Sequence, residues 1–252
     1  MEIKVSHLSK SFGGLRAVDD LTVTIPHGRT TGLIGPNGSG KTTLMNLLTG
    51  TLEPDCGEII IGDKSFTRMI PTDLRNLKIA RTFQDGRLIN QMSVSDNLLL
   101  AIVETRTVPS LMDNSPLGMG GGAGSRAGVG SRLNTILKKI HLTEKRDANA
   151  EELSYGQRKL LELGRAMITD ADVYLLDEPF TGLFPAMVEQ VAEILTELKS
   201  AGKTLVIIEH NIGLIRRLAD NVIVMDHGAL LASGTPDKVL KNKAVQQAYL
   251  GV

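Results

Sequence analysis

The most specific chemical signal in this sequence is the stretch GPNGSGKT, from Gly35 to Thr42. The stretch fits the pattern G-x-x-x-x-G-K-[ST]; it follows the apolar run TTGLI and precedes the apolar-periodic run TLMNLL. Glycines allow the backbone to curl, so that successive N–H groups and the N-terminus of a helix face an anionic phosphate. Lys41 adds a positive charge, and the Thr42 hydroxyl can ligate Mg²⁺. The stretch therefore predicts a phosphate-binding loop between a buried strand and a helix.

Two adjacent carboxylates form a second signal, because Asp177 and Glu178 end the apolar run DVYLLDE. At the end of a strand, Asp177 can hold Mg²⁺ directly or through water, and Glu178 can orient or deprotonate an attacking water. Two solvated acids are the alternative interpretation. Beside a phosphate-binding loop, the pair favours a catalytic metal and water site.

Three weaker signals gain meaning only together. The segment LSYGQRKLLELGRAM places Ser154 and Gly156 just before a strongly periodic helix, where a hydroxyl and backbone N–H groups at a positive helix end suit a phosphate. Gln84 in RTFQD follows an apolar stretch, and His210 in VIIEHN ends a predicted strand. Taken alone, these are an ordinary helix cap, a surface glutamine and a packed or solvated histidine.

The elements that position these residues follow from the hydrophobic pattern. IKVSHLS and LTVTI alternate apolar and polar residues, as half-buried antiparallel strands do. Short apolar runs separated by helical patterns are typical of a parallel sheet covered by helices. These runs are TTGLIG, DVYLLDE, TLVIIEH and NVIVMDHG. The sequence therefore predicts an α/β fold.

The middle of the chain, from about Gln91 to Met167, has mostly helical patterns. A glycine-rich, apolar-poor segment from Asn114 to Arg132 interrupts them, and we interpret it as a flexible surface loop. Phosphate binding by its glycines is the alternative, although no strand pattern precedes them and no GK[ST] follows.

Composition limits the remaining interpretations. A chain of 252 residues with 42% hydrophobic residues can build one large α/β domain or two small ones. Lys+Arg and Asp+Glu each number 28, so no overall charge attracts the chain to nucleic acid or anionic lipid. The single Cys56 excludes an internal disulfide and suits a reducing compartment. Because we find no membrane-spanning apolar run and no signal peptide, we expect a cytoplasmic protein that reaches a membrane only through a partner.

In this order, the motifs GPNGSGKT, RTFQD, LSYGQ, LLDEP and IIEHN resemble those of the nucleotide-binding subunit of ATP-binding cassette (ABC) transporters, over essentially the whole chain. The resemblance implies an α/β P-loop NTPase fold with a mostly parallel sheet, an N-terminal antiparallel β subdomain and an inserted helical subdomain. We expect a single nucleotide-binding domain over 1–252. Its ATP-binding core is expected at 1–86 and 168–252, and its helical subdomain at 87–167, with the glycine-rich loop at 114–132.

The resemblance also implies ATP and Mg²⁺ as cofactors. Glu178 would act on the attacking water, and His210 would contact the γ-phosphate. The catalytic set also includes Gln84, which together with Thr42 and Asp177 would arrange Mg²⁺. The aromatic residue in SKSFGG matches the one that stacks on adenine in the family. The nucleotide-binding residues implied by the resemblance are Phe12, Gly35, Pro36, Asn37, Gly38, Ser39, Gly40, Lys41, Thr42, Thr43, Ser154, Gly156 and Gln157.

Partners are implied as well. Two such domains close head to tail around two nucleotides in the family, so Ser154 and Gly156 would act on ATP held by a second ATP-binding subunit, identical or different. Integral membrane permease subunits would dock on Gln84 and on the helical segment Gly86–Ala101, for which an ordinary exposed helix is the alternative. A solute-binding protein would take part indirectly. No nucleic acid would bind, and the chain would lie at the cytoplasmic face of the membrane.

The variants IARTFQ, LSYGQ and RKLLELGRAM and the ending AYLG look most like the ATP-binding subunits of branched-chain amino acid importers. ATP-binding subunits of urea or amide importers, or of lipopolysaccharide exporters, are the alternatives within the family. Two more distant alternatives are a soluble cassette protein that remodels a ribosome or DNA and a binding-only regulatory cassette. The first of these usually has a second cassette or a long coiled-coil insertion, and the sequence shows neither.

Two residues depart from the family pattern. Tyr155 replaces the small residue that is more common in the signature, and we interpret it as a mark of the importer branch. Phe184 stands in TGLFP, where the family turn normally reads GLDP and crosses to the partner subunit. A phenyl ring cannot accept the hydrogen bonds that a carboxylate accepts, so Phe184 either alters communication between the two ATP sites or packs against an apolar partner surface.

Overall fold

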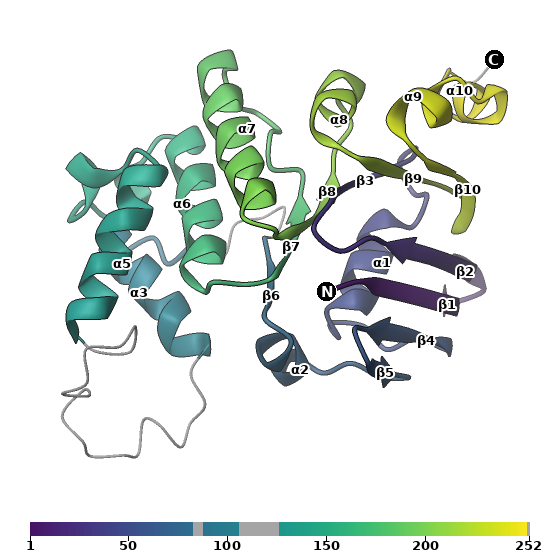
Figure 1. Cartoon of the computed structure of the whole chain (residues 1–252), viewed down its shortest axis with the longest axis horizontal. Helices are drawn as coiled ribbons and strands as arrows, with labels where there is room; N and C mark the ends of the chain where they lie inside the picture. The colour runs from purple at the N-terminus through teal and green to yellow at the C-terminus, as the bar shows by residue number, and fades with distance from the viewer. Residues whose placement is uncertain (83–87, 106–125, 251–252) are drawn as a thin grey trace. The chain divides into compact units, whose positions relative to one another are not determined.

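The computed structural model describes residues 1–82, 88–105 and 126–250 (Figure 1). The chain divides into two compact units, a core unit of Met1–Gln84, Asp172–Phe180 and Leu195–Val252 and a helical unit of Asp85–Ala171 and Thr181–Ile194. Both β-sheets belong to the core unit. No helix among the described residues is both long and apolar enough to cross a membrane.

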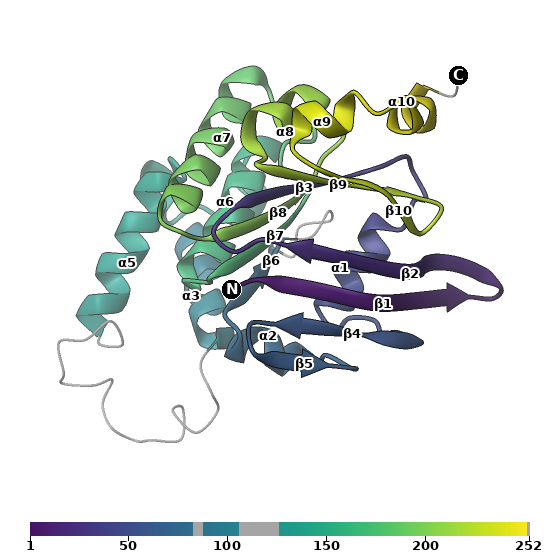
Figure 2. The ribbon, with the colours of Figure 1, turned by 45° about the vertical axis from the view of Figure 1, so that its right-hand side comes forward.

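The N-terminal part of the core unit is a four-stranded antiparallel sheet in the order β2-β1-β4-β5 (Figure 2). The alternating pattern of IKVSHLS and LTVTI thus correctly predicts two antiparallel strands. Their pairing runs from Ile3 opposite Ile25 to Phe12 opposite Leu15, so Phe12 lies at the tip of a tight hairpin. The strands are β1 (Ile3–Phe12), β2 (Leu15–Ile25), β4 (Cys56–Ile61) and β5 (Lys64–Phe66).

A six-stranded sheet with the order β10-β9-β3-β8-β7-β6 forms the rest of the framework. Its strands pair in parallel except for the β9–β10 pair, which confirms the predicted mostly parallel sheet. β3 lies between β8 and β9, and β8 lies between β3 and β7, so the carboxyl ends of β3, β7 and β8 meet at one edge. The strands are β3 (Thr30–Ile34), β6 (Ile79–Arg81), β7 (Val173–Asp177), β8 (Thr204–Ile208), β9 (Asn221–Asp226) and β10 (Ala229–Gly234).

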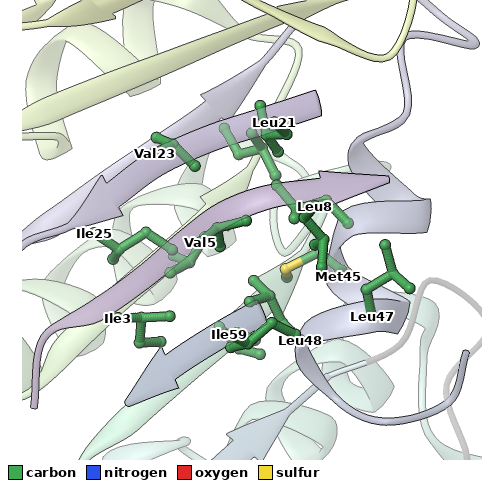
Figure 3. Close-up of a cluster of buried hydrophobic side chains, with 14 of the residues drawn as sticks. Ile3, Val5, Leu8, Leu21, Val23, Ile25, Met45, Leu47, Leu48 and Ile59 are labelled. Atoms are coloured by element: carbon green, nitrogen blue, oxygen red, sulfur yellow. The ribbon is translucent and has the colours of Figure 1, made fainter. Parts of the chain in front are cut away.

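The main hydrophobic core of the core unit joins the antiparallel sheet, helix α1 (Lys41–Leu48) and one face of the parallel sheet. Figure 3 shows Met45 and Leu48 of α1 among side chains from β1, β2 and β4. Leu33 belongs to this cluster, whereas the next residue, Ile34, belongs to a second cluster, because successive residues of a strand face opposite sides. Burial of each such side chain contributes roughly 1.5–3 kcal/mol. The phosphate-binding loop is therefore anchored at both ends in packed structure.

The second cluster packs the other face of the parallel sheet against helices from the C-terminal part of the chain. It includes Ile215, Val239 and Val245, one from each of three of these helices. The remaining described helices of the core unit are α2 (Pro71–Asn76), the last part of α7 (Pro185–Ser200), α8 (Ile212–Leu218), α9 (Pro236–Leu240) and α10 (Lys243–Leu250).

Helices pack closely in the helical unit. At Gly164 an added Cβ would lie 2.7 Å from Ile140 and 3.2 Å from Leu98, so the missing side chain lets the helices approach one another. Helix α3 starts only at Val94, later than expected within Gly86–Ala101, because the Ser93 hydroxyl accepts the N–H of Asp96 and ends the preceding turn. The helices are α3 (Val94–Thr105), α5 (Arg126–Lys139), α6 (Tyr155–Ile168) and the first part of α7 (Pro185–Ser200), with short 3₁₀ turns at Thr143–Lys145 and Ala150–Glu152.

The predicted glycine-rich loop, Asn114–Arg132, is wrong in its last part, because α5 already starts at Arg126. Glycines within this helix cost roughly 1 kcal/mol each relative to alanine. Burial of Leu133, Ile136 and Leu137 at helical spacing overrides that local preference. The rest of the predicted loop lies outside the described residues.

The two compact units divide the chain differently from the predicted subdomains. Residues 168–171 and 181–194, assigned from the sequence to the ATP-binding core, group with the helical unit. Residues 181–194 group with the helical unit because they contact the start of α6. Tyr155 packs on Gly182, and Met187 fills the space beside Gly156.

Candidate nucleotide-binding site

The phosphate-binding loop connects β3 to α1, as the motif predicts. Gly35 has a φ of 151° and Gly40 a φ of 98°, values that disfavour residues with a side chain. A Cβ would overlap the carbonyl oxygen of Met225 at Gly35 and that of Ala17 at Gly40. Gly40 is the N-cap of α1 and, as a glycine, has no side chain that could cap this helix. The first N–H groups of α1 therefore remain available to an anion.

Lys41 lies inside the loop and holds it in shape. Its Nζ donates to the carbonyl oxygens of Gly35 and Pro36, each at 2.9 Å, and lies 3.4 Å from the Ser39 hydroxyl. Burial lowers the pKa of Lys41, an effect that the negative charges of Glu178 and then Asp177 oppose. A buried ammonium ion bonded to neutral carbonyls is well placed to gain an anionic ligand.

A cavity of about 810 Å³ opens beside the loop and belongs entirely to the core unit. The phosphate-binding loop, the start of α1, Phe12, Glu178 and His210 all line this cavity. Its lining residues are Phe12, Leu15, Arg16, Ala17, Asn37, Gly38, Ser39, Gly40, Lys41, Thr42, Thr43, Glu178, Ile208, His210 and His227. The structure thus brings together most residues that the sequence assigned to nucleotide binding and hydrolysis.

Parallel pairing explains why Glu178 meets His210. Asp177 of β7 pairs with Ile208 of β8, so the residues just beyond both strand ends lie at the same level. The Glu178 N–H donates to the Ile208 carbonyl, and its carboxylate Oε1 lies 3.0 Å from His210 Nε2. Glu178 has a φ of 48°, an unusual value for a residue with a side chain, and such strain tends to occur at functional sites.

Asp177 occupies the last position of β7 and its side chain is only 4% exposed. It does not line the cavity directly, although its charge acts on Lys41. The Asp177 N–H donates to the Thr82 hydroxyl at 3.2 Å. A buried carboxylate that directly precedes cavity-lining Glu178 and acts on Lys41 is a suitable oxygen ligand for a metal bound together with phosphate.

The charges of the cavity favour a polyanion, although the whole chain has no net charge. Among the cavity-lining residues, Arg16 and Lys41 carry positive charge and Glu178 is the carboxylate. His210 and His227 add ring nitrogens, and the open N–H groups of α1 add partial positive charge. The attraction for phosphate is therefore local.

Other predicted residues lie elsewhere. Ser154 and Gln157 belong to the helical unit and form a capping box at the start of α6: the Ser154 hydroxyl accepts the Gln157 N–H at 3.3 Å. Gly156 is buried beside Met187 in the same unit. Gly35 and Pro36 support the loop through Lys41 without lining the cavity. Gln84 lies outside the described residues.

Several residues in or next to the cavity were not predicted from the sequence. Arg16 comes from β2 and His227 from the turn between β9 and β10, and no local motif marks either residue. Glu209 directly precedes His210 and is buried; its Oε1 accepts the N–H groups of His210 and Asn211 and so holds this turn. The adjacent letters EH in VIIEHN were the available signal for Glu209.

The two residues that depart from the family pattern have different surroundings. The ring of Tyr155 lies against Gly182, its hydroxyl donates to the Thr181 carbonyl at 3.3 Å, and Lys159 Nζ lies 5.9 Å from the ring centroid. Tyr155 therefore connects the signature to the turn that contains Phe184. By contrast, Phe184 is 78% exposed, the largest exposed fraction among the large hydrophobic residues described.

Comparison with known proteins defines the class. The family model described as "ABC transporter" matches residues 18–181. Two solved structures match over 100% of both chains: a nucleotide-free ATP-binding cassette from an ABC transporter, with 31% identity and a TM-score of 0.85, and the ADP conformation of an ATP-binding cassette of an ABC transporter, with 32% identity and a TM-score of 0.84. The chain belongs to the ABC transporter family and is an ATP-binding, ATP-hydrolysing subunit of a membrane transporter.

More specific relatives point to one branch of the family. The model described as "Branched-chain amino acid ATP-binding cassette transporter" matches residues 229–252. The chain is 33% identical to the high-affinity branched-chain amino acid transport ATP-binding protein LivG of Escherichia coli (strain K12), over 99% of this chain and 97% of that protein. It is 34% identical to the probable LivG protein of Archaeoglobus fulgidus, over 99% of this chain and 95% of that protein.

Proposed function

We propose that this chain hydrolyses ATP in the cavity beside the phosphate-binding loop and thereby powers import of branched-chain amino acids. The observation that carries the hydrolytic part is the presence of the phosphate-binding loop, Glu178 and His210 around one cavity. Support for the solute comes from the C-terminal match at residues 229–252 and from relatives named for branched-chain amino acid transport.

Two groups of cavity residues would bind ATP, one at the adenine and one at the phosphates. Phe12 is 45% exposed at the tip of the β1–β2 hairpin, and Lys10 Nζ lies 5.7 Å from its ring centroid, so the exposed part of the ring can stack on adenine. At the phosphates, Lys41 and the open N–H groups at the start of α1 hold the β- and γ-phosphates. The triphosphate would thus exchange contacts with water for contacts with a cation and with the N-terminus of a helix.

The residues also fit Mg²⁺. The Thr42 hydroxyl and the Asp177 carboxylate offer hard oxygen ligands, with Gln84 as the third predicted ligand. The described residues contain no cluster of three or more His, Cys, Asp or Glu that could hold a metal by itself, which agrees with an ion that takes its other ligands from phosphate and water. When bound, Mg²⁺ neutralises charge on the phosphate oxygens.

Glu178 supplies the base for hydrolysis. A water oxygen attacks the γ-phosphorus, the water proton passes to the Glu178 carboxylate, and the bond from the γ-phosphorus to the bridging oxygen breaks to release ADP and phosphate. His210 orients that carboxylate through the 3.0 Å contact. The His210 side chain is 42% exposed, so it can also turn to contact the γ-phosphate once ATP is bound.

Partners complete the function. Ser154 and Gln157 cap α6 and Gly156 lies in its first turn; all three belong to the other unit and none lines the cavity, so we propose that they act on ATP held by a second ATP-binding subunit. Integral membrane permease subunits dock on Gln84 and Gly86–Ala101 and hold the chain at the cytoplasmic face of the membrane. A solute-binding protein delivers the amino acid to the permease.

The Glu178→Gln variant tests the hydrolytic mechanism. The amide keeps the size of the side chain and a polar contact with His210 but cannot accept the proton, so turnover should fall by about 10² or more while ATP affinity stays within a few-fold. Phosphate release is measured in the assembled transporter, and ATP binding is measured by titration calorimetry. Glu151→Gln, at an exposed position of the helical unit, is the matched control. Normal turnover in Glu178→Gln would contradict the role of Glu178.

Uptake of labelled leucine tests the solute. Cells that lack this chain receive the wild type, Glu178→Gln or Glu151→Gln. We expect leucine uptake with the wild type and with Glu151→Gln but not with Glu178→Gln. None of the three should affect uptake of labelled urea. Uptake of urea rather than leucine that depends on this chain would leave the ATPase mechanism intact and refute the assignment of the solute.

A further inference from the structure

Arg81 has a buried, charged side chain next to Asp177. It ends β6, and its side chain is only 4% exposed. Its Nη2 lies 3.7 Å from Oδ2 of Asp177, whose side chain is also 4% exposed. Its Nη1 donates to the Thr49 hydroxyl at 2.8 Å and to the Met45 carbonyl at 3.3 Å. One guanidinium group thus reaches both Asp177 and the end of α1.

The partners of Arg81 at α1 are themselves fixed. Thr49 is the C-cap of this helix and is 2% exposed, and its hydroxyl donates to the Met45 carbonyl at 2.8 Å. The carbonyl end of a helix carries partial negative charge, which stabilises a cation. The planar guanidinium group has little freedom once two of its nitrogens have partners. Arg81 therefore has a defined position relative to the helix whose first turn carries Lys41.

Asp177 has two contacts with the end of β6, one through its main chain and one through its side chain. Its main-chain N–H donates to the hydroxyl of Thr82, the residue next to Arg81, and its carboxylate faces the Arg81 guanidinium. Because β6 and β7 pair in parallel, with Arg81 opposite Leu175, both contacts come from the same end of β6. An apolar residue could fill the space beside Asp177 at a lower desolvation cost, but it could not orient a carboxylate.

We propose that Arg81 is a positioning residue that fixes the Asp177 carboxylate relative to the phosphate-binding helix, so that Mg²⁺ and nucleotide bind together. This inference rests on the proposed role of Asp177 as a ligand of Mg²⁺. Groups that hold metal ligands in place typically change metal affinity by about 10–100-fold when they are lost. Loss of Arg81 should therefore reduce the gain in nucleotide affinity that Mg²⁺ provides.

Titration of the full-length protein with ADP, with excess Mg²⁺ or with EDTA, measures that gain as a ratio of two Kd values. In Arg81→Met we expect the ratio to fall by about tenfold, with the Kd in EDTA unchanged. Arg81→Lys should retain part of the gain. Thr49→Val, which keeps Arg81 but removes its hydroxyl partner, should show a smaller loss in the same direction. Arg68→Met, at an exposed arginine of the core unit, is the matched control and should match the wild type.

Asp177→Asn, alone and combined with Arg81→Met, separates this proposal from the proposed function. If Arg81 acts through Asp177, Arg81→Met should have no further effect on the ratio in the Asp177→Asn background. An unchanged ratio in Asp177→Asn itself would refute the metal role of Asp177. A reduced ratio in Asp177→Asn with a normal ratio in Arg81→Met would refute the positioning role alone.

Two other outcomes would overturn the positioning role of Arg81. An equal loss of affinity with Mg²⁺ and with EDTA would show that Arg81 has only a structural role. A larger gain from Mg²⁺ in Arg81→Met would show that Arg81 competes with the metal for Asp177, and either result overturns the proposal. If thermal unfolding shows that Arg81→Met does not fold, Arg81→Lys and Thr49→Val are judged by the same ratio.

Discussion

Replacement of Gly40 by alanine should deform the phosphate-binding loop, and the structure gives the approximate free-energy cost of this substitution. The φ of 98° at Gly40 is strained for any residue with a side chain, which costs roughly 1–3 kcal/mol. The new Cβ would also overlap the Ala17 carbonyl oxygen and lie 3.2 Å from the Met225 methyl carbon. Displacing that backbone should cost roughly another 1–3 kcal/mol.

Gly38→Ala is the matched control for this prediction. Gly38 also lines the cavity and has a φ of 79°, but a Cβ there would meet no heavy atom of the described residues within 4 Å. It should therefore show the cost of backbone strain without the overlap. We expect Gly40→Ala to reduce the free energy of unfolding by about 2 kcal/mol more than Gly38→Ala does.

Urea denaturation without nucleotide measures this difference. A bound nucleotide would change the free energy of unfolding by itself, and the two variants would bind it differently. Calorimetry with ADP then tests the consequence for function: Gly40→Ala should bind at least about tenfold more weakly, since a displaced loop turns its N–H groups away from the phosphate. Equal destabilisation by the two substitutions would refute the argument from the overlap with Ala17.

Further predictions concern three aromatic side chains. Phe12→Ala should weaken ATP binding by about tenfold through loss of adenine stacking, with an unchanged free energy of unfolding, as calorimetry and urea denaturation can show. Burial raises the pKa of Tyr249 to about 12, and the Gly35 backbone opposes the shift. Between pH 10 and 12 the unfolded chain therefore loses this proton first, and the free energy of unfolding should fall as pH rises; Tyr249→Phe should lack this part of the fall. Phe184→Asp should change the ATPase rate or cooperativity of the assembled transporter more than the ATP affinity of the isolated subunit, because Phe184 is 78% exposed. Equal effects on both measurements would count against a role in communication between subunits.

Local patterns predicted much of the site. The glycines of GPNGSGKT specify a backbone that side chains disfavour, and the strand–helix context is adjacent in the sequence, so the loop could be recognised directly. The apolar runs before Asp177 and His210 predict strands, and parallel strands end at a common edge. These features depend on residues only a few positions apart.

Other features depend on residues far apart in the chain. The early start of α5 at Arg126 follows from burial of its apolar side chains, which overrides the preference of glycine for loops. Arg16 and His227 reach the cavity only because β2 and the turn between β9 and β10 fold back beside the phosphate-binding loop. No spacing in the sequence specifies these approaches.

By itself, the sequence determined the family, the phosphate-binding loop and the order of the strands and helices along the chain, because each depends on short-range backbone and hydrophobic patterns. Only the tertiary structure decided which of the five motifs share a cavity: the loop meets Glu178 and His210, whereas Ser154 and Gln157 cap a helix of the other unit. It also decided that Arg81 faces Asp177 across 3.7 Å. Contacts of this kind depend on strand order and long-range packing, which similar local patterns can satisfy in more than one way.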